Sequence, residues 1–416
     1  MKNFVTIALL PVVTALIAAS LIAQDGRRTN APTQTDKPYV LLISIDGFRP
    51  DYVGLHGAPN LERFATAGVR AESMIPSYPS ETFPNMYTLV TGMYPGNHGI
   101  VANEFFDRNR RASYDRRDPG AVRDGSWYGG TPLWVAAEKQ GMLSGSYYWV
   151  GSEAAIAGVR PAYYIRYEPP PLPNQERVEG VLEWLSLPEE SRPHLITLYF
   201  SAIDSVAHQS GTNSEELGAA IAALDREIEF LLDTIEELPF EVNVFILSDH
   251  GMVDRDPEKV IYLDDYIDLK GIETVGLGTH TFLYFDDDPE LIDTLYDELR
   301  RYPDVFSVYK REETPPRWHS NHERLGDLVI DAVPPWSVSF RFTDARFEGG
   351  AHGYDPYLNE EMHAIFYARG PNLAESTVIP SFENIHVYPL IMEILGLELP
   401  EGIDGRLEVL EGILRR

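Results

Sequence analysis

Six side chains of the kinds that bind metal ions occur at widely separated positions of the chain. They are Asp46, Asp204, Asp249, His208, His250 and His352. A carboxylate at the end of a strand often caps a helix, and a single histidine is usually a hydrogen-bonded core residue, so each position alone has a structural explanation. Together they predict a metal centre. Oxygen and imidazole ligands without sulfur favour Zn²⁺ over Mn²⁺ or Fe, and six ligands are enough for the two-metal arrangement that holds a phosphoryl group during in-line displacement.

A candidate nucleophile lies in the segment 77–85, which reads SYPSETFPN and leads into an apolar helix. Pro84 suits the first turn of that helix. The hydroxyl of Thr82 would then lie at a helix start, where backbone N–H groups and the helix dipole favour a bound anion or an alkoxide. Thr82 as a simple N-cap explains this segment equally well, so the segment alone leaves both interpretations open.

The elements that must position these residues are buried strands. Continuous apolar runs over 39–45, 194–200 and 242–249 predict strands covered on both faces, and 214–238 between the last two has a serine cap and helical spacing. This order predicts an α/β fold with a doubly wound, mostly parallel central sheet, helices on both faces and loop-rich insertions. Ligands gather at the carboxyl ends of such strands, where Asp46, Asp204 and Asp249 would lie. His208 follows Asp204 by four residues, so a helical turn there would put both on one face.

The other expected elements are less closely tied to the chemistry. Glycines around His352 would allow the backbone to approach a crowded site closely. Helices are expected over 59–67, 84–91, 132–140 and 384–395, a helix and a strand within 287–312, and a loop-rich stretch from Pro315 to Pro335.

The amino-terminal residues differ in composition from the rest. Residues 1–23 hold a lysine and a long apolar run, which predicts a signal peptide or an uncleaved membrane anchor. Residues 24–37 are polar and predict a linker, and 38–416 is expected to form a single catalytic domain. The protein is therefore expected to be exported, and periplasmic or secreted unless the first segment anchors it.

Composition excludes several classes of chemistry. The chain has no cysteine, which rules out disulfides, thiol nucleophiles and a lipid-modified cysteine. Its formal net charge of −30 argues against a nucleic-acid groove. A small anion can still bind where the charge of a metal dominates the site.

Eight ordered motifs resemble the nucleotide pyrophosphatase/phosphodiesterase family of the alkaline phosphatase superfamily, from about residue 38 to the end of the chain. They are IDGFRPDY (45–52), TFPN (82–85), LVTGMYP (89–95), HGIVAN (98–103), WYGGTPLW (127–134), WVGSE (149–153), SDHGM (248–252) and FENIHVY (382–388). The resemblance implies an alkaline-phosphatase-like fold. It also implies hydrolysis of phosphodiester and pyrophosphate bonds through a phosphothreonine, with release of nucleoside 5′-monophosphates.

The resemblance also divides the ligands into two sets. One zinc would be held by Asp204, His208 and His352, and the other by Asp46, Thr82, Asp249 and His250. Asn103 and the backbone N–H of Phe83 would bind a phosphate oxygen.

Substrate contacts follow from aromatic residues near the nucleophile. Phe83 with Tyr164 or Tyr163 could stack on a base, and of the two tyrosines Tyr164 fits the family better. An apolar Phe83 and the lack of a neighbouring arginine favour diesters over monoesters. Without cysteine, and with Phe83, Pro84 and Asn85 after the threonine, the chain lacks the sulfatase motif.

Three features depart from the family pattern or lie outside it. Ile203 and Ala207 stand where the family has proline and glycine, which predicts a pocket of different shape beside one zinc. The arginines from Arg108 to Arg117 would form either an anion-steering lip or a solvated loop. His319 and His322 are candidates for the entrance.

The expected partner is a small nucleotide or another phosphodiester, with membrane contact only if the first segment is uncleaved; the sequence does not predict an oligomeric state. An alternative is a relative that cleaves choline or lipid phosphodiesters, for which an acidic aromatic cage would be diagnostic. A third possibility, a catalytically silent nucleotide or partner binder, fits poorly because the ligand set is complete.

Overall fold

Eight strands form the central sheet of the computed structural model, which describes residues 29–286, 288–344 and 347–415. Their order across the sheet is β19-β2-β18-β9-β1-β8-β6-β7. In that order they are Thr377–Ile379, Val69–Ala71, Phe366–Arg369, Val242–Leu247, Tyr39–Ile45, Leu195–Phe200, Ser144–Tyr147 and Tyr163–Ile165.

The middle of this sheet is parallel. β1 pairs in parallel with both β8 and β9, with Ile45 opposite Phe200 and Ser44 opposite Leu247. The carboxyl ends of the three strands therefore meet at one edge, as expected from the sequence. β18 runs antiparallel to β9 and β2.

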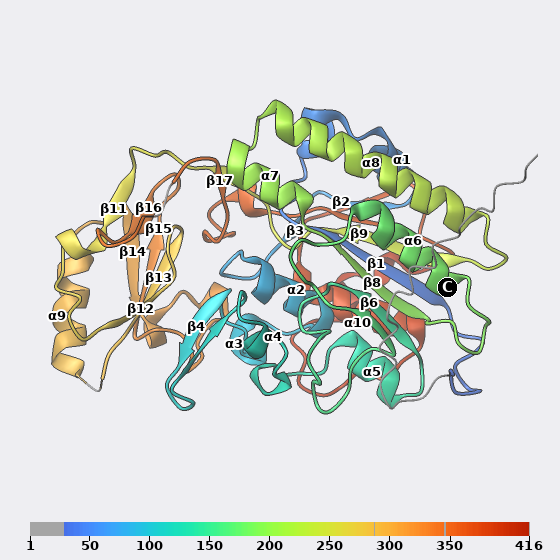
Figure 1. Ribbon diagram of the computed structural model, residues 1–416, viewed down its shortest axis with the longest axis horizontal. Helices are drawn as coiled ribbons and strands as arrows, with labels where there is room; N and C mark the ends of the chain where they lie inside the picture. The colour runs from blue at the N-terminus through green and yellow to red at the C-terminus, as the bar shows by residue number, and fades with distance from the viewer. Residues whose placement is uncertain (1–28, 287, 345–346, 416) are drawn as a thin grey trace, which may run out of the picture.

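Helices cover both faces of the sheet (Figure 1). On one face lie α1 (Pro59–Ala67), α6 (Asn174–Leu185), α7 (Ala202–Ser210) and α8 (Glu215–Glu236). On the other lie α2 (Thr82–Thr91), α5 (Leu133–Lys139) and α10 (Val387–Leu395). Because neighbouring strand residues point to opposite faces, Leu41 joins the core under α8, whereas Leu42 joins the core under α10.

Shorter elements surround the second face. α3 (Pro95–His98) and α4 (Pro119–Val122) lie beside a hairpin of β4 (Glu104–Asp107) and β5 (Ala112–Asp115). β3 (Met74–Ile75) pairs with β20 (Phe382–Glu383).

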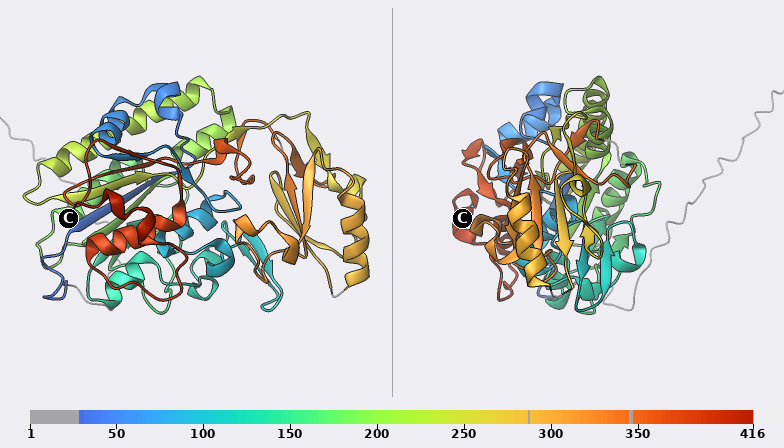
Figure 2. Two further views of the ribbon diagram at one scale, coloured as in Figure 1. Left: turned by 180° about the vertical axis from the view of Figure 1, so that it is seen from behind. Right: turned by 90° about the vertical axis from the view of Figure 1, so that its left-hand side faces the viewer.

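A small lobe is inserted after β9 and stands beside the main body (Figures 1 and 2). Its sheet has the order β12-β13-β15-β14, with α9 on its outer side. In that order the strands are Glu273–Val275, His280–Tyr284, Leu328–Ala332 and Phe306–Lys310, and α9 is Pro289–Leu299. The lobe has a hydrophobic cluster of its own, which includes Leu283, Leu299 and Ile330.

Short strand pairs complete the region around the lobe. β11 (Val260–Tyr262) pairs with β16 (Ser337–Ser339), and β10 (Val253–Asp254) pairs with β17 (Gly350–Ala351). The second of these pairs leads the chain directly to His352.

Most expected elements occur within two or three residues of their predicted ends. Ser214 caps α8 by accepting a hydrogen bond from the Leu217 N–H at 3.2 Å. The expected helix and strand within 287–312 are α9 and β14. The loop-rich prediction for 315–335 is wrong at β15, because its apolar residues are buried between β13 and β14.

The amino-terminal predictions are only partly covered. The export segment 1–23 lies outside the described residues. In the described part of 24–37, the buried side chain of Asn30 donates to the Arg192 carbonyl at 2.8 Å and accepts from the Leu143 N–H at 2.8 Å, so this part of the segment packs on the domain. Among the described residues, none of the helices combines the length and apolarity needed to cross a bilayer.

Candidate active site

Asp204, His208 and His352 form the first cluster of potential metal ligands. Asp204 lies in the first turn of α7 and His208 one turn later, so that their Oδ1 and Nε2 atoms are 3.2 Å apart. His352 Nε2 lies 3.1 Å from His208 Nε2 and 3.5 Å from Asp204 Oδ1. The helix expected after Asp204 thus aligns both side chains, and the loop after β17 supplies the third.

Asp46, Asp249, His250 and Thr82 form the second cluster. His250 Nε2 lies 3.3 Å from Asp46 Oδ1, 3.4 Å from Asp249 Oδ2 and 3.2 Å from Thr82 Oγ1. Asp46 directly follows β1, and Asp249 and His250 follow β9 after one residue. The parallel pairing of these strands therefore brings the two carboxylates together.

The two clusters are adjacent. Asp46, Asp204 and His250 also offer ligand atoms that all lie within 4.8 Å of one another, so Asp204 belongs to both sets. The rings of His250 and His352 stack with centroids 3.7 Å apart. All seven residues expected to hold metal ions are thus gathered at the carboxyl edge of the sheet.

Backbone contacts orient the three imidazoles. The Nδ1 atoms of His208, His250 and His352 lie 2.9 Å from the carbonyl oxygens of Gly350, Gly251 and Ser80, respectively. A carbonyl only accepts, so each Nδ1 carries the proton and each Nε2 presents its lone pair to the cluster. This is the tautomer that a metal-binding histidine needs.

The three aspartates each place one carboxylate oxygen on the side of the imidazole Nε2 atoms. Asp46 Oδ1, Asp204 Oδ1 and Asp249 Oδ2 are buried and accept no hydrogen bond from any described residue. Burial, followed by the neighbouring Asp249, raises the pKa of Asp46, and burial raises the pKa of Asp249 although His250 opposes it. Burial also acts to raise the pKa of Asp204, but His208, His352 and His250 together lower it. Buried, unsatisfied carboxylates need a cation, and oxygen and imidazole donors suit zinc.

Thr82 is the first residue of α2 and its side chain does not cap the helix. Asn85 shapes the loop before it: its side-chain amide donates to the carbonyls of Pro79 and Glu81 at 2.9 and 2.8 Å and accepts from the Ser77 N–H at 2.7 Å. The loop thereby turns the Thr82 hydroxyl towards His250. The simple N-cap interpretation is therefore wrong.

Two serines join the site loops to one another. Ser80 Oγ donates to the Tyr354 carbonyl at 2.7 Å and accepts from the Gly353 N–H at 3.1 Å. Ser248 Oγ accepts from the Phe48 N–H at 3.0 Å and donates to the His250 carbonyl at 2.6 Å. The loop before α2 is thus joined to the loop after β17, and the loop after β9 to the loop after β1.

Tyr199 was not expected from the sequence. Its buried hydroxyl donates a short hydrogen bond to Asp46 Oδ2, which leaves Oδ1 facing the cluster. Tyr199 is the second-to-last residue of β8. The only sequence feature that could have indicated its role is a side chain with a polar tip near the end of an otherwise apolar strand.

Asn103 lies beside the start of α2. Its Oδ1 accepts from the Phe83 N–H at 2.9 Å. The two groups expected to bind a phosphate oxygen are therefore in direct contact, one residue beyond Thr82.

The two candidate tyrosines point to opposite faces of β7. Tyr163 packs on Trp184 and donates to the Ser191 carbonyl at 2.9 Å, on the α6 side of the sheet. Phe83 packs against the core on the other face, the face to which Tyr164 alternates. Tyr163 and Phe83 therefore pack on opposite faces of the sheet, and stacking of a base by Phe83 with Tyr164 stays a prediction.

The other candidates have structural partners. Arg108 pairs with Asp327, Arg110 with Asp107 at 3.5 Å and Arg117 with Glu104 at 2.7 Å, so these three arginines have carboxylate partners. His319 stacks on Tyr94, and His322 Nδ1 accepts from the Arg324 N–H at 3.0 Å.

Ile203 and Ala207 lie on the buried face of α7. They are one helical turn apart, as are Asp204 and His208. Their apolar side chains therefore anchor the ligand-bearing helix on the sheet.

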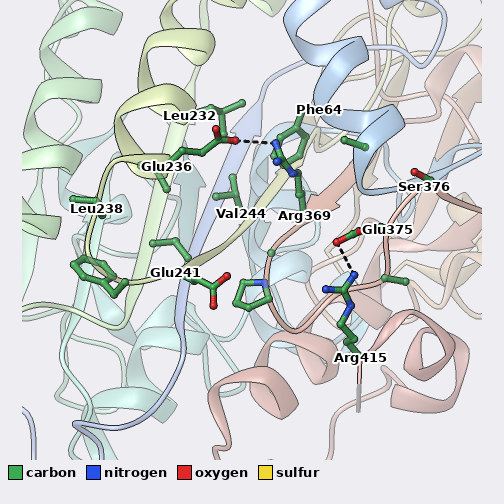
Figure 3. A pocket seen from close by; sticks show the side chains of 17 residues that line it. Phe64, Leu232, Glu236, Leu238, Glu241, Val244, Arg369, Glu375, Ser376 and Arg415 are labelled. Atoms are coloured by element: carbon green, nitrogen blue, oxygen red, sulfur yellow. Dashed lines mark hydrogen bonds and ion pairs between the residues drawn. The ribbon is translucent and has the colours of Figure 1, made fainter.

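A cavity lies away from this centre (Figure 3). It measures about 600 Å³ and is lined by the start of β9 and the end of α8. Its arginines are paired, Arg369 with Glu236 at 3.0 Å and Arg415 with Glu375 at 2.7 Å. It contains none of the clustered ligands, so it is not the site.

Comparison with known proteins agrees with the fold. An inactive variant of murine ectonucleotide pyrophosphatase/phosphodiesterase 5, in complex with AMP, superposes with a TM-score of 0.85 at 29% identity, covering 91% of this chain and 100% of that chain. The architecture is therefore the alkaline-phosphatase-like α/β class.

The family follows from sequence comparison. A model described as type I phosphodiesterase/nucleotide pyrophosphatase matches residues 40–355. Ectonucleotide pyrophosphatase/phosphodiesterase family member 1 of Mus musculus is 34% identical over 399 residues, 92% of this chain and 44% of its own length. An uncharacterized pyrophosphatase/phosphodiesterase of Schizosaccharomyces pombe is 33% identical over 393 residues, 89% of this chain and 80% of its own length. The chain belongs to the type I phosphodiesterase/nucleotide pyrophosphatase family, although it spans less than half the length of the first mammalian relatives it matches.

Proposed function

We propose that this chain is a two-zinc nucleotide pyrophosphatase and phosphodiesterase that releases nucleoside 5′-monophosphates through a phosphothreonine on Thr82. The observation that carries the proposal is the convergence of three free carboxylate oxygens and three imidazole Nε2 atoms beside the Thr82 hydroxyl. Such a set is suited to phosphoryl chemistry at a hydroxyl nucleophile.

The residues divide into two ligand sets. Asp204, His208 and His352 would hold one zinc, and Asp46, Thr82, Asp249 and His250 would hold the other. The bound ions supply charge that lowers the pKa of the threonine hydroxyl and of a water and that offsets the negative charge of the phosphate.

The chain's own groups carry the reaction. Thr82 Oγ forms a bond to phosphorus as the bond to the leaving oxygen breaks, and the hydroxyl proton is released. Water then attacks the phosphothreonine from the side of the departed group, which frees Thr82 and a monophosphate. Asn103 binds a non-bridging oxygen, and Phe83 and Tyr164 stack on the base.

The relatives support nucleotides as the substrate class. The superposed murine protein holds AMP in a variant called inactive, in which a threonine is replaced by alanine. Several of the relatives are named as ectonucleotide enzymes, which supports export of this chain as part of the proposal. Cell fractionation with and without residues 1–23 tests that part.

Replacement of the nucleophile tests the reaction. We expect Thr82→Ala to lower the turnover of p-nitrophenyl thymidine 5′-monophosphate, with zinc present, by about a hundredfold or more, because no hydroxyl remains to attack phosphorus. Thr82→Ser, which keeps a hydroxyl, should retain more activity. Undiminished turnover by the alanine variant would remove Thr82 from its role. Preference of the wild type for a choline phosphodiester would assign the alternative substrate class.

A further inference from the structure

Glu81, directly before the candidate nucleophile, is joined to Asn103. The Asn103 N–H donates to Glu81 Oε2 at 2.7 Å, and Asn103 Oδ1 accepts from the Phe83 N–H at 2.9 Å. The two hydrogen bonds close a small ring between the start of α2 and Asn103. Asn103 is thereby fixed through both its backbone and its side chain.

This ring leaves one donor of Asn103 unused. Within the described part of the chain, the Asn103 side-chain N–H₂ makes no hydrogen bond, and only its oxygen is engaged, by the Phe83 N–H. A fixed donor beside Thr82 is what an oxyanion needs, because it requires no reorganisation when charge develops. Glu81 therefore acts on the site through the placement of Asn103.

The charge of Glu81 is also poorly compensated. Its side chain is 16% exposed, and its nearest described basic partner is His280, with Nε2 3.8 Å from Oε2. Glu104, the residue after Asn103, contrasts with it, because Arg117 lies 2.7 Å from its carboxylate. A carboxylate next to the nucleophile that pairs with no described lysine or arginine repels each negative charge of a bound phosphate.

We propose that Glu81 is a positioning and specificity-determining residue that holds Asn103 and favours monoanionic phosphodiesters over dianionic phosphate monoesters. The inference rests on the proposed function. A diester carries one negative charge at neutral pH and a monoester nearly two, so the same carboxylate penalises the monoester more.

Two variants separate position from charge. Glu81→Gln keeps an acceptor for the Asn103 N–H and removes the charge. We expect the ratio of kcat/KM for p-nitrophenyl phosphate to that for p-nitrophenyl thymidine 5′-monophosphate to rise about tenfold. Glu81→Ala removes the acceptor as well, and we expect kcat for the diester to fall about tenfold or more with little change in KM.

Glu104→Gln is the matched control, and its ratio should stay at the wild-type value because Arg117 already offsets that charge. Thermal unfolding of each variant, followed by circular dichroism, verifies that the variants are folded. An unchanged substrate ratio in Glu81→Gln, or full diester turnover in Glu81→Ala, would overturn the inference. Wild-type protein inactive on the diester would instead refute the proposed function, so the two failures are distinct.

Discussion

At the scale of single residues, the site depends on groups that orient the ligands as much as on the ligands themselves. Each imidazole is fixed by one backbone carbonyl, and Asp46 is fixed by the Tyr199 hydroxyl. Such outer contacts set which atom of a ligand faces a metal ion. They depend on tertiary packing, which explains why the spacing of residues in the sequence did not indicate them.

Tyr199→Phe tests the contribution of these orienting contacts. The change removes the hydrogen bond to Asp46 Oδ2 and leaves the ring in place. We expect zinc affinity to fall about tenfold, because loss of an outer contact to a ligand typically has this effect. Competition with a chromogenic chelator gives the affinity.

Tyr163→Phe serves as the control for Tyr199→Phe. It also removes a tyrosine hydroxyl, but that hydroxyl donates to the Ser191 carbonyl and not to a candidate metal ligand. Equal zinc affinity in the two variants would contradict the role of Tyr199.

At the scale of elements, three strand ends and two helix starts bring the ligands together. Apolar runs predicted β1, β8 and β9, because strands buried on both faces have an unambiguous pattern. The spacing of Asp204 and His208 predicted the aligned pair on α7 for the same local reason. The sequence left Thr82 open between cap and nucleophile, because the answer depends on His250, which lies far along the chain.

Local patterns also failed in identifiable places. β15 was predicted as loop because prolines flank it, and its burial between two strands of the small lobe was not a local property. The resemblance favoured Tyr164 over Tyr163, but the local pattern did not show that the two side chains lie on opposite faces of the sheet.

Asn85→Ala tests the loop before α2. Asn85 satisfies two carbonyls and one N–H of this loop, and truncation leaves these groups without that partner. We expect the free energy of unfolding to fall by about 3 kcal/mol, with a parallel loss of turnover. Urea titration provides the free energy.

Asn109→Ala is the comparison, since the exposed Asn109 amide contacts the Glu323 carboxylate at the surface. The Asn109→Ala change should alter the free energy of unfolding by no more than about 0.5 kcal/mol. Similar destabilisation by both changes would show that the loop does not depend on Asn85.

At the scale of the whole molecule, a small lobe stands beside a doubly wound body (Figure 2). Asp331, in the lobe's strand β15, is buried and its Oδ1 has no hydrogen-bond partner among the described residues. Burial, followed by the nearby Asp355, raises the pKa of Asp331 well above its usual value. The folded protein therefore favours the protonated acid.

This raised pKa predicts a pH dependence of stability. Below the unfolded-state pKa of about 3.9, the acid is protonated in both states and its stabilising contribution is complete. As the pH rises towards the raised folded pKa, the unfolded chain ionises first and the contribution is lost. Asp331→Asn cannot ionise, so its stability advantage over wild type should grow by about 1 kcal/mol or more between pH 5 and pH 8.

Urea unfolding of both proteins at several pH values measures this difference. Glu312→Gln, at an exposed position of the same lobe, should leave the pH profile unchanged. Parallel stability profiles for Asp331→Asn and wild type would contradict a raised pKa.

The chain order of the ligands has a consequence for biosynthesis. The ribosome delivers Asp46 early, and His352 leaves it only after the entire small lobe has been made. A nascent chain that ends within the lobe already contains Asp46, Asp249 and His250. It still lacks His352, which completes the cluster with Asp204 and His208. The proposed metal centre can therefore be completed only after the small lobe has been made, so a nascent chain that ends within the lobe lacks part of the ligand set.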